Sequence, residues 1–485
     1  MSRPLANTIW IVLAFLACTS VLFLNGRPLF YYDTVGYVDQ GRVALTQLGL
    51  IDPAGAGALG QGVAETGHTV DGSRSPSYSL FAGVFAQAGV LEALLAMSAG
   101  ALFLAVWLLA RVAARVFAPG ASIVASACLP LIVAGFGSLP FYIAYLMPDI
   151  LAPVMILVIA TMTAFGRDMR VWELLLAFAL AAFAVVSHLS HFAIAGLMLL
   201  AALLISGMMA RRLWWLAPLM VVAVLGTAYL QQKAFRVVAQ NTANSEVVIK
   251  PYITARLIQD GPGLRYLESH CPNADMPTCA LYEALGWSDN PWRLTATHIV
   301  FETSKDLGSF RLMTEENQKS VADAQVGFFL DVLMDMPVAT SLAFLNNTII
   351  QSSMTSIDMT LPSDLVVQSN ARVTGVLSGQ LTHGRLVETG GWFAPLMQFQ
   401  RLLYMVALAV IVTLLVLPGR VPARVKAFAV MIILGILANA LVCGGISQPA
   451  ARYGARMIWL LPFTATFMLF WAMQAGRLSK FGGRS

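Results

Sequence analysis

The sequence predicts an all-α polytopic membrane protein with about ten transmembrane helices. Hydrophobic residues make up 58% of the 485 residues and charged residues only 11%, far below the roughly 25% charged residues of soluble domains. Uncharged apolar runs of about 20 residues, the length that spans a bilayer as a helix, recur along the chain. Residues 174–210 form a much longer uncharged run. As one helix it would reach about 55 Å, against roughly 30 Å of hydrocarbon, so it predicts a two-helix hairpin.

The other spans are predicted from apolar runs that end at charged or polar connections. The long run counts as two spans because it is too long for one. The ten expected spans are 8–24, 93–110, 121–139, 150–166, 174–210 (two), 213–232, 402–419, 427–451 and 457–476.

Basic residues gather in alternate short connections between these spans. Lys and Arg near span ends resist translocation, so these connections are expected to be cytoplasmic, together with both termini. The net charge of +5 reflects this topology, and no nucleic-acid module is predicted. The segments expected outside are 25–92, 140–149, 187–191, 233–401 and 444–456. The basic residues that set the orientation are Arg3, Arg111, Arg115, Arg167, Arg170, Arg211, Arg212, Arg420, Arg424, Lys426, Arg477, Lys480 and Arg484.

Three modules follow from this topology. Residues 1–232 form an N-terminal membrane module with a polar first outside loop (25–92), 233–401 an extracytoplasmic domain of mixed composition, and 402–485 a C-terminal three-helix membrane module. Within the domain, 315–335 predicts an amphipathic helix that stops before Pro337. The next stretch, 338–354, is apolar enough to dip into the membrane interface.

Two cysteines in the outside domain predict a disulfide. Cys271 and Cys279 flank a short polar stretch containing two prolines, in a compartment that permits oxidation. The alternative is a pair of free thiols, and a metal site is less favoured because only His270 lies beside them. Cys18, Cys128 and Cys443 lie in spans and are expected to be packed small residues.

The first outside loop carries the densest polar signal. If 31–42 is helical, Asp33, Tyr37 and Gly41 share a face, and the carboxylate lies beside aromatic surface just above the membrane. Asp33 then suits a general base that takes a proton from an attacking hydroxyl, with partial burial raising its pKa toward the working pH. The alternative is a helix cap or a solvated loop acid.

Two further outside segments carry polar residues close to span ends. A basic loop containing Arg74 turns at Pro76 into the apolar stretch 77–91, which is too short to span and predicts a helix in the interface. Asp149 lies at the head of the fourth span. It either caps that helix or shares a polar cavity with Asp33.

The order of these pieces resembles the GT-C superfamily of polyprenyl-phosphate-sugar-dependent glycosyltransferases, such as the protein O-mannosyltransferases and the lipid A aminoarabinose transferases. The likeness covers the topology of most of the chain, including a large outside loop after span seven. The chain departs from several of those enzymes at Thr34, where they have Glu, so a paired-carboxylate metal site is not expected. The motifs that carry the likeness are Asp33 followed by Tyr37 and Arg42, then Arg74-Ser75-Pro76-Ser77-Tyr78, Asp149 and Arg452-Tyr453.

The resemblance implies a donor whose lipid phosphate needs cationic support as it leaves. Arg452 and Arg456 are one helical turn apart and would face the same way at the outside head of the last span. Guanidinium groups bind phosphate bidentately at any working pH, although Arg at a span end also serves as an interfacial anchor. Arg74 ranks first among the loop arginines. His188 and His191, in the turn of the 174–210 hairpin, either contact phosphate or acceptor or satisfy the turn.

The expected function is therefore glycosyl transfer at the periplasmic face of a bacterial inner membrane. The acceptor is a glycan, a lipid or a protein, the reaction inverts the anomeric carbon, and Asp33 acts as the base with Asp149 beside it. The substrate cleft is expected at Tyr37, Arg42 and Tyr78. No nucleotide cofactor is expected, and the sequence leaves open whether the reaction requires a divalent metal. The alternatives are an O-antigen ligase or polysaccharide polymerase that uses a lipid-diphosphate-linked glycan, and a membrane transporter.

Overall fold

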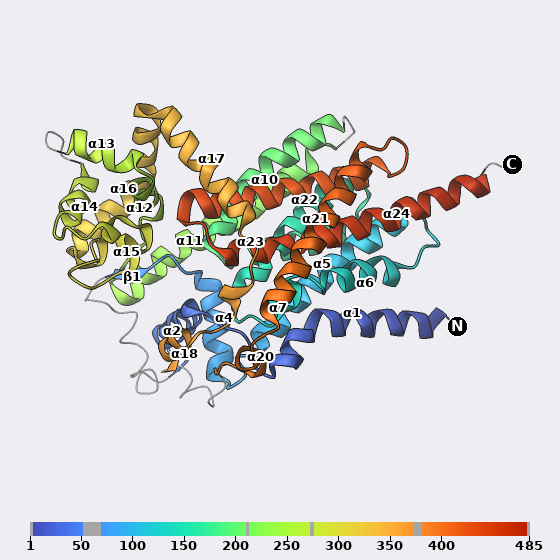
Figure 1. Cartoon of the computed structure of the whole chain (residues 1–485), viewed down its shortest axis with the longest axis horizontal. Coiled ribbons are helices and arrows are strands. Elements are labelled where there is room, and N and C mark those ends of the chain that lie inside the picture. The colour runs from blue at the N-terminus through green and yellow to red at the C-terminus, as the bar shows by residue number, and fades with distance from the viewer. Residues whose placement is uncertain (1–2, 52–68, 210–212, 272–275, 372–380, 483–485) are drawn as a thin grey trace.

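The computed structural model describes residues 3–51, 69–209, 213–271, 276–371 and 381–482. These residues are almost entirely helical, with two three-residue strands. Figure 1 shows a long helical bundle with a compact helical domain at one end, and the first and last helices begin and end at the opposite end.

The N-terminal part of the chain, up to residue 243, holds the predicted first loop (25–92) and most of the long helices of the bundle. Its elements are α1 (Arg3–Asn25), α2 (Tyr32–Gln47), β1 (Thr69–Asp71), α4 (Pro76–Gln87), α5 (Ala93–Phe117), α6 (Ile123–Ala134), α7 (Leu139–Ile143), the 3-10 turn η2 (Pro148–Ile150), α8 (Leu151–Phe165), η3 (Gly166–Asp168), α9 (Val171–Val186), α10 (Leu189–Met208) and α11 (Leu216–Ala243).

The rest of the chain builds the compact domain and then returns to the bundle. Its elements are β2 (Glu246–Val248), α12 (Tyr252–Asp260), α13 (Pro262–His270), α14 (Pro277–Leu285), η4 (Pro291–Leu294), α15 (Ala296–Phe301), η5 (Phe310–Leu312), α16 (Glu315–Asp335), α17 (Pro337–Ser353), η6 (Asp358–Thr360), α18 (Asp364–Ser369), α20 (Arg385–Thr389), α21 (Phe393–Val416), α22 (Ala423–Val442), the π-turn η7 (Cys443–Ser447), α23 (Ala451–Ile458) and α24 (Leu460–Gly482).

Seven helical segments of the described residues are long and apolar enough to cross a membrane, or eight if the bent pair α16–α17 counts as one span. The protein is therefore an α-helical multi-pass membrane protein, but the prediction of ten full-length spans is not confirmed. The seven segments are Pro4–Asn25, Ala93–Phe117, Pro148–Asp168, Leu189–Met208, Phe393–Val416, Ala423–Ser447 and Ala451–Ala475.

The other three predicted spans do not match helices with the predicted bounds, and each has a local reason. The run 121–139 is helical only as far as Ala134, because a turn at 135–138 ends α6. Helix α9 has 16 residues and ends at Val186, with Ser187 as its C-cap, so the predicted hairpin is present but its first arm is short. Helix α11 continues to Ala243 with a polar second half, well past the expected end of that span.

Helix α8 lies at the centre of the bundle, where its whole apolar window is buried. A helix that is hydrophobic all round is expected in such a place.

Basic residues at one end of the bundle form ion pairs and hydrogen bonds that join neighbouring helices. Arg115 donates to Glu173 and to the Asp168 carbonyl, and Arg424 pairs with the Asp168 carboxylate. These contacts tie α5, α9 and α22 together at that end.

The compact domain has a separate hydrophobic core made of buried residues from Val248 to Val332. Ile357, Val366 and Leu381 belong instead to the larger core of the bundle. The domain is joined to the segment between α2 and α4 by parallel pairing of β1 with β2, in which Val70 lies opposite Val247.

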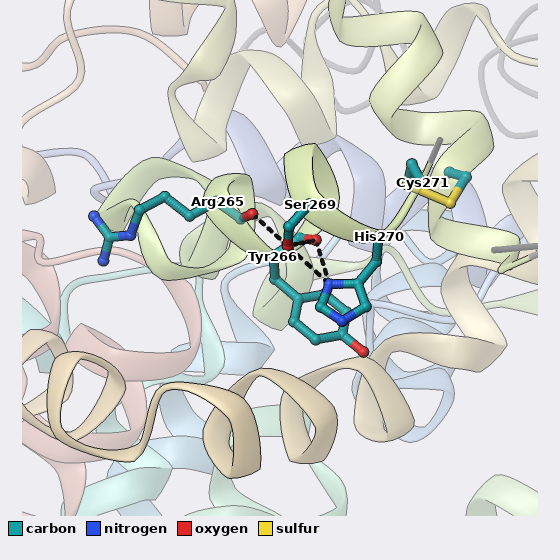
Figure 2. The surroundings of a disulfide bond; sticks show 6 residues. Arg265, Tyr266, Ser269, His270 and Cys271 are labelled. Carbon is teal, nitrogen blue, oxygen red and sulfur yellow. Dashed lines mark hydrogen bonds between the residues drawn. A yellow bond between two sulfur atoms is a disulfide. The ribbon is translucent and has the colours of Figure 1, made fainter. Parts of the chain in front are cut away.

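The disulfide between Cys271 and Cys279 is present, as predicted. It joins the end of α13 to α14 at the edge of the compact domain. Figure 2 shows the preceding turn, in which the rings of Tyr266 and His270 stack 4.0 Å apart. The His270 ring also contacts the Tyr266 carbonyl, with Nδ1 2.9 Å from that oxygen. The His270 ring therefore makes its contacts within its own helix.

Candidate functional site

The stretch predicted to carry the first acid is helical, and Asp33 lies in the first turn of α2. The next residue, Thr34, takes part in the N-cap of this helix. Its Oγ1 accepts a hydrogen bond of 3.0 Å from the Tyr31 backbone N–H, and its side chain is buried. Thr34 therefore caps the helix, while Asp33 stays one-third exposed and available to a ligand.

Close packing of α2 on α4 sets the position of Asp33. A Cβ atom at Gly41 would lie 1.8 Å from the Ser79 carbonyl oxygen, and one at Gly83 would lie 2.5 Å from the Gly41 carbonyl carbon. The two backbones therefore touch without side chains between them, which only glycine permits. The rings of Tyr37 and Tyr78 pack edge to face across the same interface, with centroids 5.0 Å apart.

Arg74 reaches Asp33 from the loop between β1 and α4. Its Nη2 lies 3.4 Å from Asp33 Oδ1, and its Nη1 lies 3.1 Å from Asp71 Oδ2. Gly36 makes room for the guanidinium, because a Cβ atom there would lie 2.4 Å from Arg74 Cζ. The turn into α4 is fixed by Ser75, whose side chain accepts from the Tyr78 N–H.

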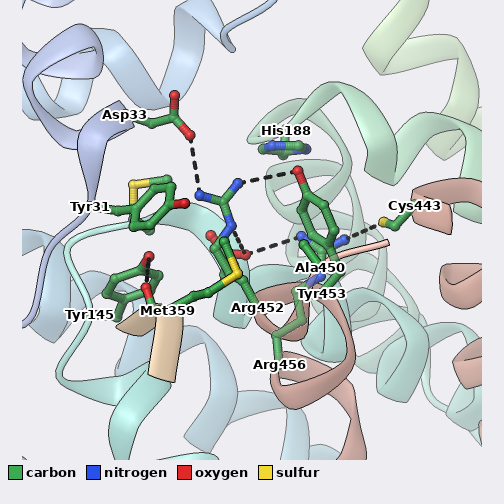
Figure 3. Close-up of polar contacts among 12 residues, drawn as sticks. Tyr31, Asp33, Tyr145, His188, Met359, Cys443, Ala450, Arg452, Tyr453 and Arg456 are labelled. Carbon is green, nitrogen blue, oxygen red and sulfur yellow. Dashed lines mark hydrogen bonds and ion pairs between the residues drawn. The ribbon is translucent and has the colours of Figure 1, made fainter. Parts of the chain in front are cut away.

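Arg452 connects the two predicted acids. Its Nη1 lies 3.2 Å from Asp33 Oδ2, and its Nε lies 3.5 Å from Asp149 Oδ1. Figure 3 shows the guanidinium between the rings of Tyr31 and Tyr453, with Cζ 4.7 Å and 5.0 Å from their centroids. Such cation–π contacts stabilise a positive charge in a site with little water.

Arg456 faces the same way as Arg452, as predicted, but it lies deeper. It is fully buried, and its Nη1 lies 3.3 Å from Asp149 Oδ1. Its Nη2 donates to Asn439 Oδ1 at 2.8 Å and contacts Cys443 Sγ at 3.2 Å. Asp149, also fully buried at the head of α8, is therefore held between two guanidinium groups.

Sequence reasoning assigned no role to Asn439 or Tyr142. Asn439 is a buried amide inside an apolar span, which is the signal that would have indicated it, because polar groups in spans are costly and are retained for a purpose. Tyr142 donates to the Arg452 carbonyl at 2.6 Å and so fixes the backbone of α23.

The two histidines differ in what they offer to a ligand. His188 caps α10, and its Nδ1 accepts from the Ser190 backbone N–H, so the ring carries its proton on Nε2. Figure 3 places His188 beside Tyr453 and Arg452. His191 is fully buried with Nδ1 2.7 Å from the Ala184 carbonyl. Its proton is therefore used to hold α10 against α9.

Arg42 lies apart from this cluster along α2. It follows Asp33 by nine residues, which corresponds to about 13 Å of helix rise, and it is buried. The structure thus gathers Asp33, Asp149, Arg74, Arg452, Arg456 and His188 around one point and places Arg42 elsewhere on the helix.

The charge state of Asp33 differs from the expectation. Burial raises the pKa of Asp33, but the positive charges of Arg452 and Arg74 outweigh that effect, so its pKa lies below the ordinary value of 3.8. The prediction that partial burial moves this pKa toward neutrality is wrong. Asp33 is a carboxylate throughout the neutral range and has no proton to lose before it acts as a base.

A second ion pair, between Lys250 and Asp71, helps to hold Arg74 in place. Lys250, which follows β2, lies 2.5 Å from Asp71 Oδ2, and its backbone N–H donates to Ser73 Oγ at 3.0 Å. Burial raises the pKa of Asp71, but Lys250 and Arg74 outweigh burial and lower the pKa to about 2. A row of alternating charges, Lys250, Asp71, Arg74 and Asp33, therefore leads from the compact domain to the site.

The described residues contain no group of three or more His, Cys, Asp or Glu side chains placed to hold a metal ion. Comparison with family models, curated proteins and solved structures finds no match for the chain.

Proposed function

We propose that the protein is an integral membrane glycosyltransferase. It would move a sugar from a polyprenyl-phosphate donor to a hydroxyl or amine of an acceptor glycan, lipid or protein. In a bacterium the reaction would take place at the periplasmic face of the inner membrane. GT-C enzymes, which the sequence resembles, carry out this class of reaction.

One observation supports the proposal most directly. A partly exposed carboxylate, Asp33, contacts two arginines, Arg74 and Arg452, that come from distant parts of the chain. The site thus combines a proton acceptor with two groups that bind phosphate well. A lipid-phosphate donor needs both functions, because a proton must leave the acceptor while negative charge develops on the phosphate.

The proposed step is a single displacement. The acceptor oxygen attacks the anomeric carbon, the bond from that carbon to the phosphate oxygen breaks, and its electron pair leaves on the lipid phosphate with inversion of configuration. Asp33 accepts the acceptor's proton. Arg74 and Arg452 stabilise the charge of the departing phosphate, and the Nε2–H of His188 adds a donor on the same side.

The buried groups have a supporting role in this scheme. Asp149 has no access to solvent and is shared by Arg452 and Arg456. It therefore orients the Arg452 guanidinium rather than receiving a proton. Arg456 balances the charge of Asp149, and Asn439 holds Arg456 in turn.

The test uses purified protein in phospholipid vesicles. Polyprenyl-phosphate sugars with a radiolabelled sugar are supplied with an envelope extract as acceptor, and release of polyprenyl phosphate is followed together with uptake of free solutes. The proposal expects turnover that is lost in Asp33→Asn. Uptake without turnover would identify a transporter, and consumption of only lipid-diphosphate-linked glycans would identify a ligase or polymerase. Mass spectrometry of lipid-linked sugars after gene deletion would name the donor.

A further inference from the structure

Helix α17 has an inverted distribution of polar and apolar side chains. Val338, Leu342, Leu345 and Ile349 form one stripe along the helix, and between 55% and 70% of each is exposed. The opposite face carries Thr340, Asn347 and Gln351, each at most 2% exposed. A helix in water has the reverse arrangement, with its apolar stripe facing the core.

The buried polar face of α17 is fully used in contacts with the protein. Asn347 donates to Asp260 at 2.6 Å and accepts from Arg256 at 2.8 Å, which joins the helix to α12. Gln351 donates to the Ala450 carbonyl at 3.0 Å and accepts from its N–H at 2.9 Å. These contacts fix which face of the helix points outward, so the exposure of the stripe is not a matter of loose packing.

Helix α17 and the segment that follows it carry no charge. No Asp, Glu, Lys or Arg occurs from Pro337 to Ile357. Ser341 and Asn346, which flank the stripe, are neutral. Helix α17 bends by 115° from α16 at Met336, and Met334, at the end of α16, is also exposed.

The helix runs from the compact domain down to the bundle. Figure 1 shows α17 between α16 and α23, with α22 and α10 of the bundle nearby. The α22 segment is a candidate span whose Leu437 is exposed on the outside of the bundle. A Cβ atom at Gly444 would lie 2.6 Å from the Asn347 carbonyl oxygen, so α17 packs against the end of this candidate span.

We propose that the stripe of α17 lies in the bilayer, at the boundary between headgroups and acyl chains on the side of the compact domain. Lipid is the occupant that fits an apolar, charge-free outer face opposite a polar inner face, because the hydrocarbon tolerates no free charge and the polar groups are satisfied inside the protein. The neutral polar flanks set the depth at the interface. Because Gln351 binds Ala450, lipid contact also anchors the start of α23, two residues before Arg452.

Accessibility of spin labels tests this placement without an activity assay. Single cysteines are introduced in turn from 338 to 350, labelled, and measured in phosphatidylcholine vesicles with oxygen, which concentrates in lipid, and with a neutral nickel chelate, which stays in water. The native Cys18, Cys128 and Cys443 are buried and Cys271 is bonded to Cys279, so unsubstituted protein serves as the check for background labelling.

Two control positions define the scale. Leu204→Cys reports an exposed position of a candidate span, and Asp323→Cys reports an exposed position of α16 on the compact domain. The proposal expects labels at Leu342 and Leu345 to match the oxygen-to-chelate ratio of Leu204, with a helical period along the scan. A ratio like that of Asp323 would place the stripe in water. Low access of both reagents would show a protein partner or a second copy. Either result overturns the proposal.

Discussion

Arg452 and Asp33 form an ion pair of 3.2 Å although 419 residues separate them in the chain. The first helix after span one, α2, and the short helix that begins the last candidate span, α23, therefore meet at one point. Arg452 also contacts Asp149, so a single guanidinium joins the two acids that the sequence had placed in different loops. In the proposed reaction, the reactivity of Asp33 depends on its contact with Arg452.

Asp33→Asn keeps the size of the side chain and removes its basic oxygen. We expect sugar transfer to fall by about 10²–10⁴-fold, the usual contribution of a general base. Radiolabelled transfer at saturating donor measures the effect, and Asp323→Asn on the exposed surface of α16 is the matched control. Wild-type transfer by folded Asp33→Asn protein would return Asp33 to the role of a structural ion-pair partner.

Gly36→Ala tests whether Arg74 must lie against α2. The added Cβ would meet the end of the Arg74 side chain at 2.4 Å, and a flexible guanidinium moves away more easily than a backbone. Loss of its charge-assisted contact with Asp33 corresponds to about 1.5–3 kcal/mol, or roughly 10–150-fold in rate. We expect transfer to fall within that range while the melting temperature stays close to that of the wild type. An unchanged rate would show that Arg74 contributes nothing from its present position.

Asp149 and Arg456 are expected to be coupled in stability. Both are fully buried, and Asp149→Asn alone leaves the Arg456 guanidinium without its carboxylate partner, at a cost of about 3–5 kcal/mol, whereas Arg456→Gln leaves Asp149 in contact with Arg452. The double variant Asp149→Asn/Arg456→Gln removes both charges and should be more stable than the Asp149→Asn single variant. Thermal unfolding in detergent, followed by size-exclusion chromatography, measures the difference. Additive losses in the double variant would contradict the direct pairing.

The contact of α2 with α4 predicts that Gly41→Ala and Gly83→Ala destabilise the protein. Neither position has room for a methyl group, because the neighbouring atoms are backbone, and overpacking of this kind costs about 1–3 kcal/mol. Gly100→Ala in α5 is the matched control, since nothing lies within 4 Å of the added atom. Equal melting temperatures for Gly41→Ala and Gly100→Ala would mean that the two helices can separate freely.

The pair of Lys250 with Asp71 predicts a pH-dependent contribution to stability. The folded pKa of Asp71 is about 2, below its ordinary value of 3.8. The pair therefore stabilises the fold above about pH 4, and this contribution is lost as the pH falls toward 2. Lys250→Met should lower the melting temperature at pH 7 by more than at pH 3. A loss that is the same at both values would exclude the charge of Asp71 as the cause.

Local signals in the sequence predicted several parts of the site correctly. The turn between α9 and α10, the end of α16 before Pro337 and the Cys271–Cys279 disulfide all follow from patterns within a few residues. Helical spacing also placed Arg452 and Arg456 on one face, where both reach Asp149. Such features need no knowledge of distant contacts, because caps, prolines and helical periodicity act over one or two turns.

The charge state and the position of the site residues depend on contacts that form only in the folded protein. The charge state of Asp33 is set by Arg452 and Arg74, and the position of Arg74 is set by Lys250 through Asp71. The number of full-length spans also depended on where packing ends α6 and α9. Sequence by itself determined that the chain is helical, enters a membrane and carries acids and arginines at span ends. Their pairing required the packed structure, because ion pairs and burial are determined by helices that lie hundreds of residues apart in the chain.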